Sequence, residues 1–216
     1  MYRSFAFHQA RADLGHAGYL AYWRTRHAPM ARRVHGLGGY AINEIVEPFA
    51  LAPYLAAKRA AWPALDGIAV LRVSARDGLE TMARDQPAVR AWYADGPNFI
   101  GHRTARTGRE IIFQPPAERR AARPPLKGMI FCDLVRDEVA QSLAMRTGLA
   151  GEGLVVTAIE GGAGPSSLDL PDFSHVVEIW GSSLRAVCQR LAGFAAAIAP
   201  AGRTDAAMCL RETVIA

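Results

Sequence analysis

The sequence predicts an α+β fold in which one chain runs twice through the order strand, helix, strand, strand, helix, strand. Short runs rich in aromatic and β-branched residues alternate with segments whose apolar residues recur at helical spacing. Both halves of the 216 residues show this order, although their residues are only weakly similar. An arginine-rich, proline-bracketed segment lies between them. We therefore expect a first unit over residues 1–115, a linker over 116–125 and a second unit over 126–216, with two sheets that pack face to face or close into a barrel.

Aromatic and β-branched runs mark the strands of the first unit. The pattern predicts strands over Tyr2–His8, Tyr40–Val46, Ile68–Val73 and Arg109–Gln114. The first helix is expected to start with Asp13 as its N-cap and to run to about His35, before a glycine-rich stop. A second helix follows the third strand and is interrupted by Pro87. The segment Phe49–Leu65 is long for a simple connection, and we expect a short helix or an ordered loop that covers something.

The second unit repeats the same order of elements. Its expected strands are Lys127–Leu134, Gly153–Glu160, Phe173–Trp180 and Ala206–Ile215. Glu138–Thr147 is expected to be a short helix, and 184–198 carries the clearest helical stripe of the chain.

A histidine lies in the middle of the apolar stripe of the first helix. At 100° per residue, one face collects Leu20, Trp23, His27, Met30 and Val34. Pro29 has no backbone N–H, so we expect the helix to bend or restart beside His27. His27 is then either a satisfied core histidine or a general acid/base in an apolar pocket, where burial lowers its pKa and keeps it neutral.

The composition narrows the class of protein. The net charge of +5 comes almost wholly from scattered arginines, which gives little support to a nucleic-acid surface. The wide spacing of the three cysteines fits neither a zinc site nor a disulfide framework, so we expect reduced cysteines in a cytoplasmic protein. No apolar run approaches the length of a membrane span, and no cluster of histidines, cysteines and carboxylates indicates a metal. We expect no cofactor.

Four motifs of the first unit resemble one family. They are Tyr22-Trp-Arg-Thr-Arg-His27-Ala-Pro29, Gly36-Leu-Gly-Gly-Tyr40, Asp66-Gly-Ile-Ala69 and Asp95-Gly-Pro-Asn-Phe-Ile100. Their order and spacing over residues 1–114 resemble the EthD-like family. The resemblance implies a ferredoxin-like fold of the dimeric α+β barrel superfamily, in which two βαββαβ units associate through their sheets. Here both units would come from one chain as an intrachain barrel. The second half lacks these motifs, so a site is expected in the first unit only.

The resemblance also assigns roles to residues. It makes His27 the acid/base and Asp95 its orienting or electrostatic partner. Flat, rigid side chains suit a planar apolar ligand, and the expected substrate-binding residues are Tyr22, Trp23, Met30, Trp62, Trp92 and Phe99. Against this, tryptophans at helical spacing are commonly core residues, and an aspartate before Gly-Pro is commonly a turn residue. His8 and His102 could approach the same pocket, because strand ends gather there in this architecture.

The expected function is that of a cofactor-independent, oxygenase-like oxidoreductase. Its partner would be a small apolar or aromatic, polyketide-like molecule, with no nucleic acid or membrane, and a homodimer is compatible with the sequence. The alternatives are a cyclase, isomerase or dehydratase on a similar substrate, or a non-catalytic ligand-binding protein that accompanies a degradation pathway.

Overall fold

The structure of the chain is a computed structural model that describes residues 1–46, 62–114, 126–134, 153–162, 166–198 and 202–215. The expected linker over 116–125, the helix expected over Glu138–Thr147 and most of the segment Phe49–Leu65 lie outside the described residues. No described helix is long and apolar enough to cross a membrane.

The first unit contains four strands and two groups of helices. Its strands are β1 (Tyr2–Ala10), β2 (Gly39–Val46), β3 (Gly67–Val73) and β4 (Ile100–Gln114). The first helical group is α1 (Gly15–Tyr22), η1 (Trp23–His27), α2 (Ala28–Met30) and η2 (Ala31–Arg33). The second is α4 (Gly78–Asp85), α5 (Pro87–Asp95) and η3 (Gly96–Asn98). The break at Pro87 is as predicted, whereas β4 begins nine residues earlier than the expected Arg109.

The second unit follows the same plan. Its described elements are β5 (Leu126–Leu134), β6 (Leu154–Gly162), β7 (His175–Gly181), α7 (Leu184–Ile198) and β8 (Gly202–Val214). Each predicted strand is present, within four residues of its expected bounds.

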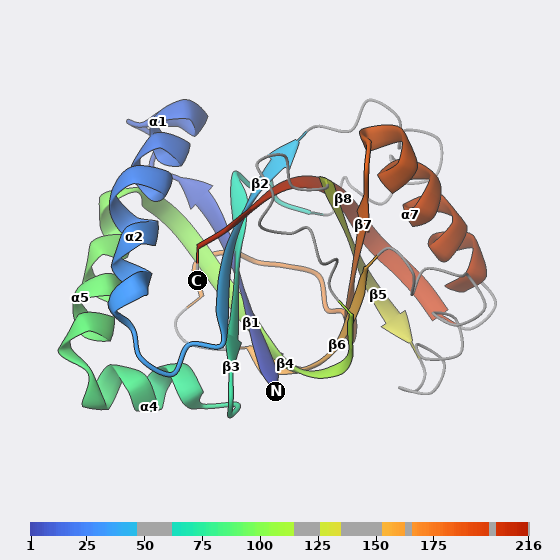
Figure 1. Ribbon diagram of the computed structural model, residues 1–216. Coiled ribbons are helices and arrows are strands. Elements are labelled where there is room, and N and C mark those ends of the chain that lie inside the picture. Colours follow the sequence, from blue (N-terminus) through green and yellow to red (C-terminus); the bar gives the residue numbers. More distant parts are fainter. Residues whose placement is uncertain (47–61, 115–125, 135–152, 163–165, 199–201, 216) are drawn as a thin grey trace.

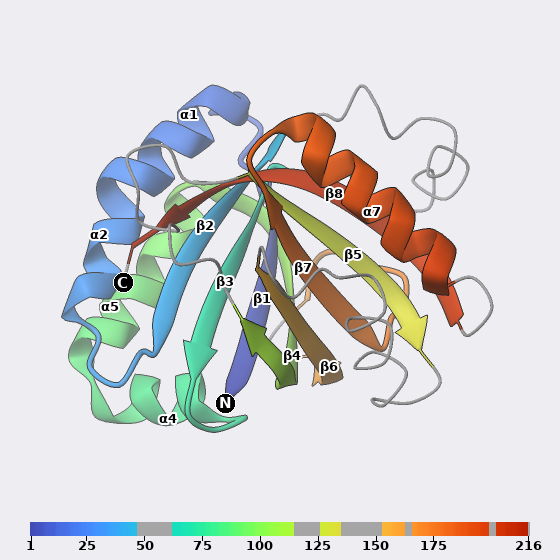
Figure 2. The ribbon, with the colours of Figure 1, turned by 45° about the vertical axis from the view of Figure 1, so that its right-hand side comes forward.

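All eight strands form one closed antiparallel barrel, in the order β1-β3-β2-β8-β5-β7-β6-β4. Each unit contributes four adjacent strands, and the arrangement β4-β1-β3-β2 in the first unit matches β8-β5-β7-β6 in the second. Two pairings join the units: β2 with β8, and β4 with β6. The α+β barrel within one chain is therefore confirmed. The helices of the first unit cover one outer side, α7 covers the opposite side, and the barrel lies between them (Figures 1 and 2).

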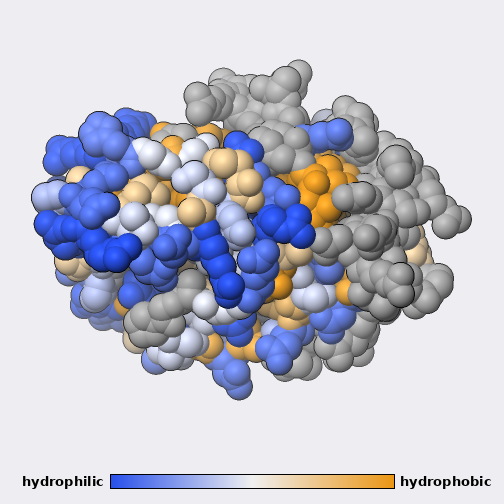
Figure 3. All heavy atoms as spheres, turned by 90° about the horizontal axis from the view of Figure 1, so that it is seen from below, coloured by the Kyte–Doolittle hydropathy of each residue, from blue (hydrophilic) through white to orange (hydrophobic). Residues whose placement is uncertain are grey.

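Three apolar clusters follow from this arrangement. One lies between the first unit's sheet and its helices, around Trp23, Trp92 and Phe99. A second lies under α7. The third fills the barrel interior, where residues of both sheets meet. Seen from below, the outer surface on the helical side of the first unit is mostly hydrophilic (Figure 3).

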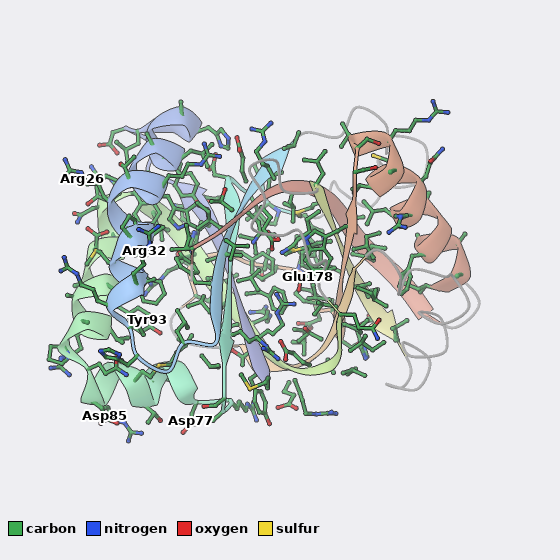
Figure 4. All side chains as sticks on the ribbon, viewed as in Figure 1. Arg26, Arg32, Asp77, Asp85, Tyr93 and Glu178 are labelled. Carbon is green, nitrogen blue, oxygen red and sulfur yellow. The ribbon has the colours of Figure 1, made fainter. Side chains whose placement is uncertain are left out.

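The barrel interior also holds a buried set of charges. Lys127 Nζ lies 2.6 Å from a carboxylate oxygen of Glu178 and 2.6 Å from one of Glu212, and all three side chains are at most 1% exposed. Trp180 donates from its indole N–H to Glu212, and Arg3 of the first unit pairs with Glu178. Figure 4 shows Glu178 inside the barrel. The Arg3–Glu178 pair joins the two units, and removal of either partner would leave this buried set of charges unbalanced.

The helix that carries His27 breaks where the proline predicts. The residues Trp23–His27 form one π-helical turn, in which the N–H of Ala28 donates to the carbonyl of Trp23. A short α-helical turn then restarts with Pro29 near its beginning, where a missing N–H costs least. The expected N-cap is wrong: Leu14 occupies that position, and Asp13 pairs instead with Arg11.

Candidate functional site

A cavity of about 300 Å³ lies between the first unit's sheet and its helices. Its floor comes from the helix-facing residues of β1 to β4, and its roof comes from η1, α4, α5 and η3. Its surface is mostly apolar, and every lining residue lies between Ser4 and Ala105. The cavity is therefore in the first unit, where the sequence placed the site.

A row of alanines makes room for this cavity. Ala6 of β1 pairs with Ala69 of β3 on one side and with Ala105 of β4 on the other, and all three line the cavity. Strand positions under a helix usually carry β-branched or aromatic residues. Three adjacent methyl groups leave the space that larger side chains would fill.

His27 lies at the cavity wall and is held by Asp95. His27 Nδ1 is 2.9 Å from Asp95 Oδ2, and the His27 side chain is 9% exposed. Hydrogen bonds from Asn98, Tyr22 and His27 outweigh the effect of burial and hold the pKa of Asp95 below its usual range. An ionised carboxylate only accepts hydrogen bonds, so His27 Nδ1 carries the proton. In neutral His27 the other nitrogen, Nε2, then has the free lone pair.

Asp95 is fixed by two further donors. The Tyr22 hydroxyl donates to Asp95 Oδ1 at 2.8 Å, and the Asn98 side-chain amide donates to the same oxygen at 2.9 Å. With His27 on Oδ2, both oxygens are occupied. The carboxylate is thus positioned to orient the imidazole and to stabilise its protonated form.

Burial keeps His27 neutral near pH 7. It lowers the pKa of His27, while Asp95 raises that pKa and Arg103 lowers it, and the net shift is downward. A neutral imidazole with an oriented Nε2 can accept a proton from a bound molecule.

His8 is a second histidine of the cavity. Burial, followed by the charges of His27 and Arg103, lowers the pKa of His8 to about 3, so this ring is neutral. Its Nδ1 lies 3.1 Å from the Tyr19 hydroxyl. The expectation that His8 approaches the pocket is thus met, whereas His102 is not among the lining residues.

Asp66 and Gly67 hold the end of β1 against the first helix. Asp66 accepts from the backbone N–H of Ala10 at 2.8 Å and lies 2.7 Å from His16 Nδ1. A Cβ on Gly67 would lie 2.5 Å from the Trp23 ring and 2.7 Å from the Tyr19 hydroxyl. The glycine is required by the close approach of these rings.

Several expected wall residues lie outside the cavity, although Trp92 lines it. Trp23 is fully buried and donates to the Tyr40 hydroxyl at 2.7 Å. Phe99 is fully buried, packs 4.7 Å from the His27 ring and stacks with Tyr22. These aromatic residues therefore support the pair His27–Asp95 from behind.

Two further residues correct the sequence expectation. Trp62 packs against Phe131 and Phe173 in the barrel interior, so the sheet separates it from the cavity. Met30 packs beside the helix cluster and does not line the cavity. An apolar side chain alone does not show which face of a sheet it covers.

Sequence reasoning missed the cavity residues Tyr40 and Arg103 and the alanine row. Arg103 lies opposite His8 in the register of β1 and β4, although 95 residues separate them in the chain. The one available signal was an alanine inside the β-branched run of β3, at Ala69. Among the described residues, no group of histidines, cysteines and carboxylates could hold a metal ion, and Cys132 and Cys188 are buried.

Comparison with known families agrees with the four motifs. Residues 11–103 match the EthD domain. The match covers most of the first unit, which therefore resembles an EthD domain. The match covers both members of the His27–Asp95 pair. No curated protein matches the sequence.

Solved structures share the whole barrel with this chain. A "putative monooxygenase" from Fusobacterium nucleatum has a TM-score of 0.60 and 9% identity, over 100% of this chain and 92% of its own. One of the same name from Lactobacillus acidophilus has a TM-score of 0.58 and 7% identity, over 99% and 94%. An anthrone oxidase-like protein has a TM-score of 0.52 and 9% identity, over 99% and 92%. At these identities the similarity shows the fold alone. The unit that resembles the EthD domain thus forms half of a two-unit α+β barrel.

Proposed function

We propose that this protein is an oxygenase-like enzyme that acts on a small, planar aromatic or polyketide-like molecule, with His27 as its general base. The observation that carries the proposal is the His27–Asp95 pair at the wall of an apolar cavity. A carboxylate that fixes the tautomer of a buried, neutral histidine is the arrangement that proton abstraction requires.

The proposed reaction begins with the removal of one proton from an activated methylene or a phenol. His27 Nε2 takes that proton, and Asp95 stabilises the imidazolium. The substrate anion then reacts with dioxygen, which is the oxidant. For a methylene, one oxygen atom ends in the new carbonyl and the other leaves as water with the two hydrogens, so atoms and electrons balance. The proposal needs no bound redox cofactor, because the electron-rich anion itself reduces dioxygen.

The size of the site and the names of similar structures support the substrate class. A volume of about 300 Å³ is at the lower end for small-molecule sites and suits a flat molecule of two or three fused rings. Trp92 and Tyr40 supply aromatic surface. Structures of the same fold are named as monooxygenases and as anthrone oxidase-like.

The test compares His27→Ala and Asp95→Asn with the wild type on a panel of anthrones and hydroxynaphthalenes. Oxygen uptake is followed with an electrode, and label from ¹⁸O₂ is followed by mass spectrometry. We expect His27→Ala to lose at least 100-fold in turnover and to retain ligand binding. His35→Ala is the matched control, since His35 is exposed and does not line the cavity.

Each other outcome has a definite meaning. Turnover without oxygen uptake would indicate a cyclase, isomerase or dehydratase. Binding without turnover in the wild type would indicate a ligand-binding protein. Full activity of His27→Ala would remove the base from the proposal.

A further inference from the structure

We propose that Arg103 is a specificity-determining residue that binds an acidic group, a carboxylate or an ionised phenol, on the molecule that enters the cavity. The inference deepens the proposed function, because it rests on the same cavity and specifies the chemistry of its ligand.

Three residues distinguish the mouth of the cavity from its interior. Glu80 of α4, Tyr93 of α5 and Arg103 of β4 all line the cavity and are exposed. Figure 4 shows Tyr93 on the helical side of the first unit. The interior floor is formed by the alanine row and by neutral His8. Charge is therefore confined to the mouth.

Arg103 is the permanent cation of this cavity. His8 is neutral, and burial lowers the pKa of His27, so neither adds a lasting positive charge near pH 7. Within the described part of the chain, no carboxylate lies within ion-pair distance of the Arg103 guanidinium, and that group makes no hydrogen bond. Asp95 is the nearest carboxylate in sequence to this end of β4, but its two oxygens are already occupied by three donors.

The backbone of Arg103 is fixed by the second unit. The Arg103 N–H donates to the Ser167 hydroxyl at 3.0 Å, and the Ser167 N–H donates to the Arg103 carbonyl at 2.8 Å. The guanidinium lies beside Gly96, with Nη1 3.7 Å from the place of a Cβ there. A planar guanidinium on an anchored strand, directly opposite His8, is suited to bind a carboxylate through two hydrogen bonds.

Glu80 provides the opposite charge and hence an internal control. It lines the same mouth, and no ion pair joins it to Arg103 among the described residues. Tyr93 lines the same mouth; burial raises the pKa of Tyr93 to about 12, with smaller opposite effects from Glu80, which raises it, and Arg103, which lowers it. Removal of Glu80's charge should therefore strengthen anion binding, whereas removal of Arg103's charge should weaken it.

The experiment measures binding by calorimetry, with 1-hydroxy-2-naphthoate as the anionic probe and 1-naphthol as its neutral analogue. The wild type should bind the carboxylate more tightly than the naphthol. Arg103→Gln should weaken carboxylate binding at least tenfold and change naphthol binding less than twofold. Glu80→Gln should strengthen carboxylate binding up to about threefold. The matched control is Arg32→Gln, because Arg32 is exposed and does not line the cavity.

Two results would overturn the inference. One is a wild type that binds the carboxylate no more tightly than the naphthol. The other is an Arg103→Gln variant that binds both probes as the wild type does, or loses both equally. Because the readout is binding, these results are separate from failure of the proposed reaction: His27→Ala should keep the charge preference even where no turnover is found.

Discussion

Replacement of Gly67 by alanine should destabilise the protein and disturb the site. The added Cβ would lie 2.5 Å from the Trp23 ring and 2.7 Å from the Tyr19 hydroxyl. Ordinary carbon contacts are about 3.5–4.0 Å, so the rings must move by roughly 1 Å. Both rings are fully buried, and overpacking of such cores costs about 1–3 kcal/mol. Alanine also lowers the conformational entropy of the unfolded chain, and this effect offsets about 0.4–1 kcal/mol of the overpacking cost.

We therefore expect a net loss of about 1–2 kcal/mol, which corresponds to a Tm lower by about 2–8 °C in a protein of this size. Trp23 begins the π-turn that ends at His27, so turnover should fall as well. Circular dichroism and urea unfolding measure the first effect, and oxygen uptake measures the second. Gly193→Ala is the matched control: nothing lies within 4 Å of its Cβ position in α7, and the change should stabilise by up to about 1 kcal/mol. A Gly67→Ala variant with wild-type Tm and activity would refute the reasoning.

Three other predictions concern charge. Wild-type activity should fall as the pH drops through the pKa of His27, which lies below 6.5. Because Asp95 raises that pKa, the acidic fall in the pH–rate profile of Asp95→Asn should lie at lower pH, and its maximum rate should be reduced. Native His8 titrates at about 3 and the unfolded chain at 6.5, so between these values the unfolded state binds more protons. In this window the free energy of unfolding should fall on acidification, by up to about 1.4 kcal/mol per pH unit from His8. Urea unfolding at a series of pH values should show a weaker dependence of this free energy on pH in His8→Phe. Lys127→Met should lose about 3–5 kcal/mol in urea unfolding, because two buried carboxylates lose the cation they share, with Arg3 left to pair with Glu178; a loss below 1 kcal/mol would contradict this.

Local sequence patterns predicted most of the barrel. Strands such as β5 and β7 are dense in apolar and β-branched residues, so composition alone located them. The first half of β4 escaped prediction because its residues, His102 to Gly108, include two arginines, an alanine and a glycine, which give little strand signal. These residues become a strand because β1 pairs with all of them and β6 pairs with the last three, from Arg106 onward. Pairing with neighbouring strands, rather than local sequence, thus determines the first half of β4.

The site was predicted only as far as the motifs reached. The resemblance brought His27 and Asp95 together across 68 residues, and the structure places them in hydrogen-bond contact. It did not show that Tyr22 donates to Asp95, since a wall residue and a positioning residue look alike in sequence. Arg103 and the alanine row depend on register across strands. No local pattern specifies that register.

Closure of the barrel within one polypeptide has a consequence for how the protein responds to dilution. The strands β8 and β6 cover the two edges of the first unit, β2 and β4, and they are tethered to it by the same chain. A barrel made from two separate subunits dissociates as its concentration falls, whereas a tethered partner is present at constant effective concentration. The covalent link also removes the need for two identical halves. The first unit can keep His27 and Asp95, while the second unit, which need not have the same sequence, stays paired with the strand edges of the first.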